Sequence, residues 1–326
     1  MLGLIHTLMD KAYVKQWNIG LSRVNFGDIL KTGKLGDDFT WLPNRDNNRF
    51  FADPFICKSP DNKIQVIYED YRYDDLYGKI SVTTLDDQFN VLAQKNLLDT
   101  HSHLSYPYIW QDNGTTYIMP ENSKDGEFSY YEFNHSQLRV FKKETLFKQL
   151  PLLDSTILFH DGRYWLFATH RGPHSNENLY IYHAPHWSGP YTEHKANPVK
   201  KSLVGTRPAG SFIHYQGNIY RPTQNCGEYY GKSVIINKII KLNEDEFEEV
   251  AVTELHPPKN SAYNFAIHTI NFSDDVIVID GLRRIFAPVD QIRTYLRKIL
   301  KMFIGSNLAI QFCVMDEGLV PLMSCM

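Results

Sequence analysis

A pair of short apolar strands joined by a tight turn recurs five times along this 326-residue chain. The copies start near residues 53, 106, 154, 209 and 268, and subtraction of neighbouring starts gives spacings of 53, 48, 55 and 59 residues. This period is too long for most solenoid repeats, and it suits one four-stranded blade of a β-propeller. The sequence therefore predicts an all-β fold, a five-bladed β-propeller, followed by a short C-terminal helical extension.

Turn residues hold the same place in successive copies. Gly114, Gly162 and Gly217 each follow the start of their copy by eight residues, as expected for hairpins whose turns need positive φ. Because a hairpin returns its second strand to the end where the first began, starts and return ends should meet at one mouth of a central channel. The alternative explanation for polar residues at these ends is that strand ends meet solvent. The return ends read Glu69-Asp70, Glu121-Asn122, Thr169-His170, Gln224-Asn225 and Asp280.

Three segments are expected along the chain. Residues 1–50 are a lead-in, in which residues 16–21 form a strand that completes the last blade and so removes a free sheet edge. Residues 51–285 form the propeller, and residues 286–326 form a C-terminal helix and tail. The shorter features are a helix at 26–32 and two polar connections at 195–203 and 241–253.

The C-terminal segment is patterned as an amphipathic helix. Residues 288–304 place apolar side chains at helical spacing, and Arg293, Arg297, Lys298 and Lys301 occupy the opposite face. Such a helix lies on a membrane surface or binds a partner, or it packs against the propeller with its basic face toward water. We favour packing against the propeller. Residues 308–314 are interpreted as one further strand.

Composition excludes several classes of protein. A net charge of −3 leaves no basic footprint for nucleic acid, and a 13% aromatic content is typical of strand-rich proteins that handle sugars. The cysteines Cys57, Cys226, Cys313 and Cys325 are far apart, which indicates free thiols in a reducing compartment and predicts no metal site. We see neither a signal peptide nor an apolar run that could span a bilayer, so a cytoplasmic location is expected. No phosphate-binding or dinucleotide-binding loop motif appears, and no cofactor is predicted.

The motifs resemble two groups of proteins. Asp53-Pro54 and Asp154 open the first and third copies in a way that distantly resembles the five-bladed glycoside hydrolases of the arabinanase, β-xylosidase and invertase group. A closer resemblance, over nearly residues 17–281, is to the glycosyl-hydrolase-like propeller domain of plant glucosamine inositolphosphorylceramide transferases. Similar bacterial proteins belong to surface-polysaccharide systems, which implies a role in glycan production. The motifs are Trp17-Asn18-Ile19-Gly20, Phe51-Ala52-Asp53-Pro54-Phe55, His103-Leu104-Ser105-Tyr106-Pro107, Met119-Pro120-Glu121-Asn122-Ser123, His160-Asp161-Gly162-Arg163-Tyr164-Trp165-Leu166-Phe167, Arg207-Pro208-Ala209-Gly210, Tyr220-Arg221-Pro222-Thr223-Gln224-Asn225-Cys226 and His268-Thr269.

Glycoside cleavage needs two carboxyl groups, one protonated and one ionised. Asp53 is the candidate base or nucleophile, and the resemblance implies that Asp154 tunes the pKa of a neighbour and holds the sugar. The resemblance also implies an acidic Glu at the start of the fourth copy, but Arg207-Pro208-Ala209-Gly210 contains no carboxylate. Glu121 is therefore the candidate acid. For each of these acids, the alternative is a structural residue at a strand end.

Six further residues are candidate substrate-binding groups. Arg207 and Arg221 would grip an anionic group of the substrate, such as a phosphate or a uronate, or they would form salt bridges to the acids. His268 would move a proton or hold a sugar hydroxyl, or it would be structural. The set is completed by Tyr106 and His103, which are expected to desolvate Glu121 and raise its pKa, and by Gln224.

The function predicted from the sequence is carbohydrate-active. The leading hypothesis is a glycoside-hydrolase-like enzyme that cleaves or transfers a glycosyl unit during production of a cell-surface glycan in the cytoplasm. The alternative from another class is a non-catalytic sugar- or glycan-binding module that uses the same mouth. A third hypothesis, a propeller scaffold for protein partners, predicts an apolar patch on the sides of the blades.

Overall fold

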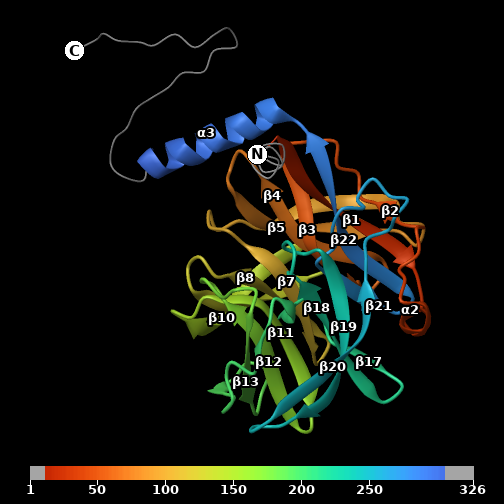
Figure 1. Ribbon diagram of the computed structural model, residues 1–326, viewed down its shortest axis with the longest axis vertical. Helices are drawn as coiled ribbons and strands as arrows, with labels where there is room; N and C mark the ends of the chain where they lie inside the picture. The colour runs from red at the N-terminus through yellow and green to blue at the C-terminus, as the bar shows by residue number, and fades with distance from the viewer. Residues whose placement is uncertain (1–11, 305–326) are drawn as a thin grey trace. The chain divides into compact units, whose positions relative to one another are not determined.

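The computed structural model describes residues 12–304, with side chains up to residue 300. Residues 14–286 form one compact unit, and the helix α3 (Pro288–Ile304) belongs to a second unit. The first unit consists of antiparallel sheets, one for each copy of the repeat (Figure 1). This arrangement confirms the predicted five-bladed β-propeller, and α3 has the bounds that the amphipathic pattern predicted.

Each sheet is one blade, and its first strand is the inner strand. The first blade contains β3 (Arg49–Lys58), β4 (Ile64–Arg72), β5 (Tyr77–Leu85) and β6 (Val91–Leu98). The second contains β7 (Ser105–Asp112), β8 (Thr115–Asn122), β9 (Glu127–Asn134) and β10 (Arg139–Lys148). The third contains β11 (Leu152–His160), β12 (Arg163–His170) and β13 (Asn178–Ala184), with β14 (Thr192–Glu193) and β15 (Lys200–Lys201) both paired to β13. The fourth contains β16 (Val204–Pro208), β17 (Ile213–Tyr215), β18 (Asn218–Asn225), β19 (Ser233–Leu242) and β20 (Phe247–Leu255).

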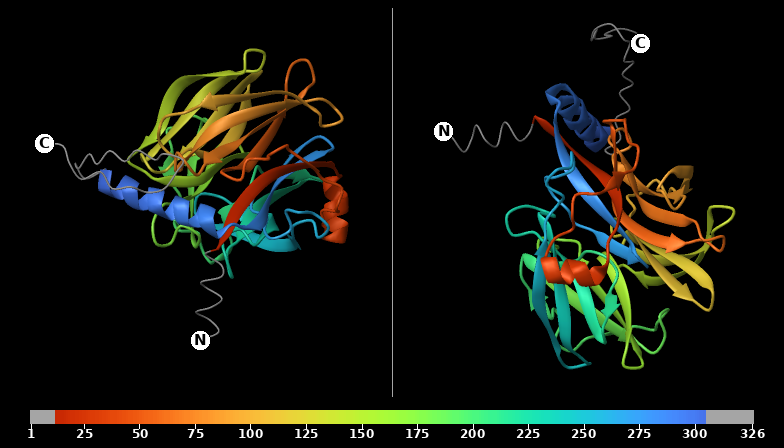
Figure 2. Two further views of the ribbon diagram at one scale, coloured as in Figure 1. Left: turned by 90° about the horizontal axis from the view of Figure 1, so that it is seen from above. Right: turned by 90° about the vertical axis from the view of Figure 1, so that its right-hand side faces the viewer.

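The fifth blade joins the two ends of the ring. It consists of β21 (Ile270–Ser273), β22 (Val276–Phe286), β1 (Tyr13–Arg23) and β2 (Thr40–Trp41), in that spatial order. Figure 2 shows the red N-terminal strand β1 beside the blue strand β22. The N-terminal strand therefore supplies the third strand of the last blade. The short helix α2 (Phe26–Thr32), which connects β1 to β2, begins after the N-cap Asn25 and ends at Gly33.

The inner strands are bent at equivalent places. We expected the first three to start at Asp53, Tyr106 and Asp154, but β3, β7 and β11 start earlier and contain these residues at register shifts. Their φ angles of 51°, 39° and 51° are left-handed, as in a β-bulge. In the fourth blade Gly210, with φ of 136°, follows β16, and a Cβ there would collide with the carbonyl of Ile270. The four bends therefore depart from regular strand geometry at equivalent positions of the ring.

Two predicted connections contain strands. Residues 241–253, which we expected to be a polar connection, lead into β20 and form most of it, and β15 lies within 195–203. The strand β20 was not recognised because its residue types do not follow its burial: Glu249 and Thr253 lie on the less exposed face, while Val250 and Val252 are exposed. The strand expected at 308–314 lies outside the described residues. Within residues 12–304, no helix is long and apolar enough to cross a membrane.

Candidate active site

A pocket of about 200 Å³ lies at the mouth where the inner strands bend. It takes residues from β1, β3, β4, β7, β8 and β16, from the turn between β18 and β19, and from the segments that precede β7 and β21. Its acids are buried, although the pocket itself is open to solvent. The lining residues are Trp17, Phe50, Ala52, Asp53, Glu69, Tyr71, His103, Ser105, Glu121, Arg207, Tyr230 and His268.

Three acids at this mouth come from return strands, as the hairpin argument predicted, and Asp53 comes from the inner strand β3. Glu69 of β4 pairs with Ala52, and Glu121 of β8 pairs with Ser105, so both lie opposite the residue that precedes a bend. Asp280 of β22 holds the corresponding place in the fifth blade, where its backbone N–H donates to the carbonyl of Thr269. The return strands therefore bring three carboxyl groups to one end of the channel.

Carboxylates also join neighbouring blades. The backbone N–H of Asp53 donates to Asp280 Oδ2 at 3.2 Å, and that of Tyr106 donates to Asp53 Oδ2 at 3.3 Å. The backbone N–H of Asp154 donates to Glu121 Oε2 at 3.2 Å. In each case an acid of one blade accepts a hydrogen bond from the bent inner strand of the next. These acids therefore have a structural role in addition to any chemical one.

Asp53 is held as a carboxylate by a charged histidine. His268 Nε2 lies 3.2 Å from Asp53 Oδ1, and its Nδ1 lies 2.8 Å from Asp280 Oδ2. Burial alone would lower the pKa of His268, but the two carboxylates hold it well above its usual range. Burial would likewise raise the pKa of Asp53, but His268 and the hydroxyl of Thr269, at 2.8 Å, lower it. The potential metal-ligand atoms of Asp53, His268 and Asp280 lie within 4.8 Å of one another, and these ion pairs account for their arrangement.

Glu121 has the opposite protonation state. Burial, and secondly the negative charge of Asp154, raise its pKa to about 8, although Arg207 opposes the shift. Its Oε1 accepts a 2.8 Å hydrogen bond from the hydroxyl of Ser123. At neutral pH the pocket therefore contains a protonated Glu121 beside an ionised Asp53.

Glu69 is a second protonated acid, and the predicted site residues did not include it. Burial, followed by the charge of Asp53, raises its pKa well above the usual range. His103 Nε2 lies 3.7 Å from Glu69 Oε1, while its Nδ1 accepts a 2.9 Å hydrogen bond from the N–H of Gly78. Burial lowers the pKa of His103, so Nε2 carries the proton of a neutral ring that faces Glu69. His103 thus lines the pocket beside Glu69.

Arg207 is paired with Asp154. Its Nε and Nη2 lie 2.5 and 3.2 Å from the two carboxylate oxygens, and Nη1 donates to Asn176 at 3.1 Å. The guanidinium also lies 5.2 Å from the centre of the Tyr230 ring. Gln224 donates a further 3.0 Å hydrogen bond to Asp154. This salt bridge is the structural alternative that the sequence left open for Arg207, and it leaves the side chain 13% exposed on the pocket wall.

Four predicted side chains are not among the residues that line the pocket: Asp154 and Gln224, which hydrogen-bond to each other beside Arg207, and Arg221 and Tyr106. Arg221 is 1% exposed and forms hydrogen bonds of 2.8 and 2.6 Å to Glu249, because its place in the middle of β18 turns it into the blade. The ring of Tyr106 packs edge to face on Phe55, and its hydroxyl accepts from the N–H of Gly210 at 2.8 Å. The aromatic lining residues Trp17, Tyr71 and Tyr230, together with Glu69 and Asp280, were missing from the predicted site, although the return-end pattern had marked the two acids.

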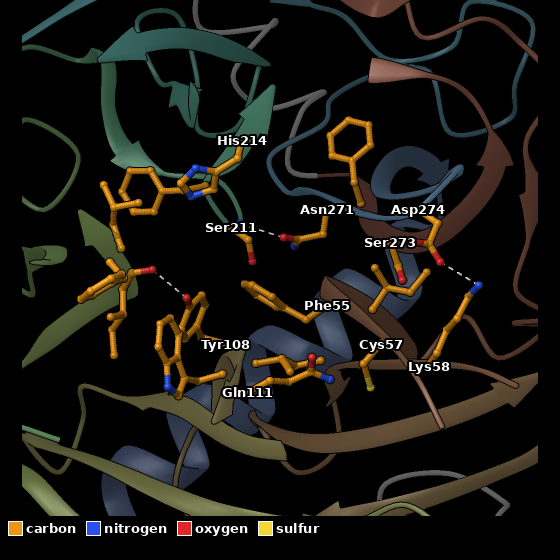
Figure 3. A pocket seen from close by; sticks show the side chains of 18 residues that line it. Phe55, Cys57, Lys58, Tyr108, Gln111, Ser211, His214, Asn271, Ser273 and Asp274 are labelled. Carbon is orange, nitrogen blue, oxygen red and sulfur yellow. Dashed lines mark hydrogen bonds and ion pairs between the residues drawn. The ribbon is translucent and has the colours of Figure 1, made fainter. Parts of the chain in front are cut away.

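A larger pocket of about 640 Å³ lies at the other end of the inner strands (Figure 3). It is lined by the later residues of β3, β7 and β11 and by the corresponding segments of the other two blades. The labelled residues show its character, with Phe55 and Tyr108 on the wall and an ion pair of 2.7 Å between Lys58 and the largely exposed Asp274. No buried acid is among its lining residues. We therefore place the candidate active site in the smaller pocket, where the buried titratable groups gather.

Two solved structures share the fold. A family 117 glycoside hydrolase from the marine bacterium Zobellia galactanivorans aligns with a TM-score of 0.52 and 11% identity, over 86% of this chain and 92% of that one. An exo-β-1,3-galactanase from Phanerochaete chrysosporium, solved with galactose, aligns with a TM-score of 0.50 and 12% identity, over 65% of this chain and 53% of that one. At such identities these similarities show the fold alone.

Sequence relatives identify the family. Curated proteins named glucosamine inositolphosphorylceramide transferase 1, from Oryza sativa subsp. japonica and Arabidopsis thaliana, are 34% and 33% identical over 211 and 251 residues. These matches cover 63% and 72% of this chain but only 28% and 32% of the relatives, so the chain spans about a third of their length. The family described as "Glucosamine inositolphosphorylceramide transferase 1, N-terminal" matches residues 43–269, which confirms the resemblance found from the motifs. The chain therefore belongs to this family of N-terminal propeller domains.

Proposed function

We propose that this protein is carbohydrate-active, and that it binds a glycosyl group in the small pocket and cleaves or transfers it during production of a cell-surface glycan. The observation that carries the proposal is the split protonation of two buried carboxyl groups, with Glu121 protonated and Asp53 ionised in one pocket. Glycosyl chemistry needs such a pair. The names of the relatives and the shared fold support the same class of substrate.

The proposed reaction assigns one role to each acid. Glu121 donates its proton to the oxygen that leaves the anomeric carbon, while Asp53 takes a proton from the attacking hydroxyl group. Hydrolysis results when water attacks, and transfer results when a hydroxyl of an acceptor attacks. Asp154 supports Glu121, because its charge raises the pKa of that acid. Arg207 forms a salt bridge with Asp154, and we propose that its guanidinium also contacts an anionic part of the substrate.

A non-catalytic glycan-binding module is the second candidate, and the contacts of Asp53 favour it. One oxygen accepts from Thr269 and lies beside His268, while the other accepts from the N–H of Tyr106. Three of the roughly four lone-pair positions of the carboxylate are therefore in use, which leaves little capacity for a substrate proton. The aromatic side chains of Trp17, Tyr71 and Tyr230 would suit stacking on a sugar ring in either case.

Turnover and binding must be measured on the same variants to separate the two candidates. Nucleotide sugars, lipid-linked sugars and aryl glycosides serve as donors, and a glycan array reports binding. We expect Glu121→Gln and Asp53→Asn to lower turnover by about 100-fold or more while glycan binding persists. Glu248→Gln, on the exposed face of β20, is the matched control and should change neither. Wild-type turnover in both site variants would refute the roles assigned to Glu121 and Asp53, and glycan binding without turnover of any donor by the wild type would favour the module.

A further inference from the structure

The helix α3, the blue helix of Figure 1, carries apolar side chains that are exposed to solvent. Its apolar residues recur at helical spacing and so lie along one side of the helix. Thr294 lies on the other side and is only 9% exposed, which reverses the usual arrangement of a soluble amphipathic helix. The exposed fractions are 60% for Val289, 60% for Ile292, 66% for Tyr295, 52% for Leu296 and 42% for Leu300.

Basic residues border this face on both sides. Each residue turns the helix by about 100° about its axis. Measured around that axis, Arg293 lies roughly 60° from Leu296 on one edge of the apolar face, and Lys298 lies roughly 60° from Tyr295 on the opposite edge. Arg297 adds a third positive charge, and Asp290, which is 3.8 Å from Arg293, is the one acid between residues 288 and 300. An apolar stripe between two basic edges is therefore exposed along the helix.

We infer that α3 binds the surface of an anionic membrane, with its apolar face among the acyl chains and its basic edges at the headgroups. This is the geometry in which helices with a polar basic face bind lipid. The helix is neither long nor apolar enough to cross the bilayer, so it lies in the plane of the surface. A second copy of the chain is a poorer occupant, because pairing two such faces would bring the basic edges of both copies together.

Flotation of the full chain with lipid vesicles tests the inference. One set of vesicles is pure phosphatidylcholine, and in the other about a third of the lipid is phosphatidylglycerol. We expect binding that is at least about tenfold tighter to the anionic vesicles and that weakens as salt is added. Wild-type protein that floats with neither kind of vesicle would overturn the inference.

Matched substitutions locate the contact. Ile292→Glu with Leu296→Glu should weaken binding to anionic vesicles by about tenfold or more, because two charges would enter the apolar region. Arg293→Glu with Lys298→Glu should remove the preference for anionic lipid. The control is Val250→Glu with Val252→Glu on β20, whose side chains are 50% and 45% exposed, and it should bind as wild type does.

Two further outcomes would contradict the inference that α3 binds lipid. If the α3 variants and the β20 control lose binding equally, the membrane contact lies outside α3. If light scattering shows a dimer that becomes a monomer in Ile292→Glu with Leu296→Glu, while vesicles bind no protein, the occupant is a second copy. Tyr295→Trp gives an independent measurement, since brominated phosphatidylcholine in the anionic vesicles should quench its added fluorescence.

Discussion

Replacing Glu121 by Gln should make the protein's stability less sensitive to pH. The pKa of Glu121 is near 4.5 when the side chain is free and about 8 in the folded protein. Between these values the folded chain holds a proton that the unfolded chain releases, so the free energy of unfolding falls as pH rises. At about 1.4 kcal/mol per pH unit, the loss between those two values is on the order of 5 kcal/mol. The contribution is fully present below the lower value and is gone above the upper one.

The amide introduced by Glu121→Gln cannot ionise, so this slope should disappear from the variant. Its oxygen can still accept from the N–H of Asp154 or from Ser123, and we expect a loss of about 1 kcal/mol at pH near 5. As pH rises toward about 8, the variant should gain on the wild type until it is the more stable protein by a few kcal/mol. The difference in the free energy of unfolding changes sign because only the wild type has an ionisable group at position 121. Near pH 8 that group must either hold its proton or carry a buried charge, and both cost stability.

Urea denaturation measured at intervals from about pH 5 to about pH 9 provides the assay. Glu248→Gln removes an exposed carboxyl group from β20 and is the matched control, which should run parallel to the wild type. Equal slopes against urea for all three proteins would show that the folded states are comparable. Parallel stability curves for Glu121→Gln and wild type would refute the reasoning, because they would mean that Glu121 is ionised in the folded protein at neutral pH.

Three further predictions follow from the charges in the pocket. If Glu121 is the proton donor, turnover should be present below its pKa of about 8 and lost above it, and a pH–rate profile that holds constant through that region would contradict the role. Arg207→Met should cost about 3–5 kcal/mol in urea denaturation, because it removes the charged partner of the buried Asp154, and adding Asp154→Asn should restore most of the loss. Equal stabilities of the single and double variants would argue against the pair. Asp53→Asn should lower the pKa of His268 in an NMR titration, since one of its two carboxylate neighbours is removed, and an unchanged value would disprove their coupling.

The ring could be predicted from sequence because hairpins are local. Gly114, Gly162 and Gly217 have positive φ in the structure, as their turns require, and they fix the register of three blades. The outer strand β20 was missed because polar residues occupy its less exposed face and valines its exposed face, so that no alternation of residue type marks it. Periodicity therefore identifies the strands that pack between other strands and overlooks those at the rim.

The site could be predicted only in part, because burial and contacts across blades are not written in local sequence. The return-end rule located Glu121 and marked Glu69, but only the fold shows that both are buried and protonated. Arg221 was predicted together with Arg207 as a group that binds an anion or forms a salt bridge, yet its position within β18 turns it toward Glu249. The partner of an arginine depends on which strands lie beside it, and those strands are distant along the chain.

The acids that fasten one blade to the next have a reason to persist that is separate from any reaction. A homologue without catalytic activity would still need Asp53, Glu121 and Asp280 for the hydrogen bonds that join its blades. Their presence in a relative therefore says little about whether that relative is an enzyme. Loss of these acids would first weaken the contacts between neighbouring blades.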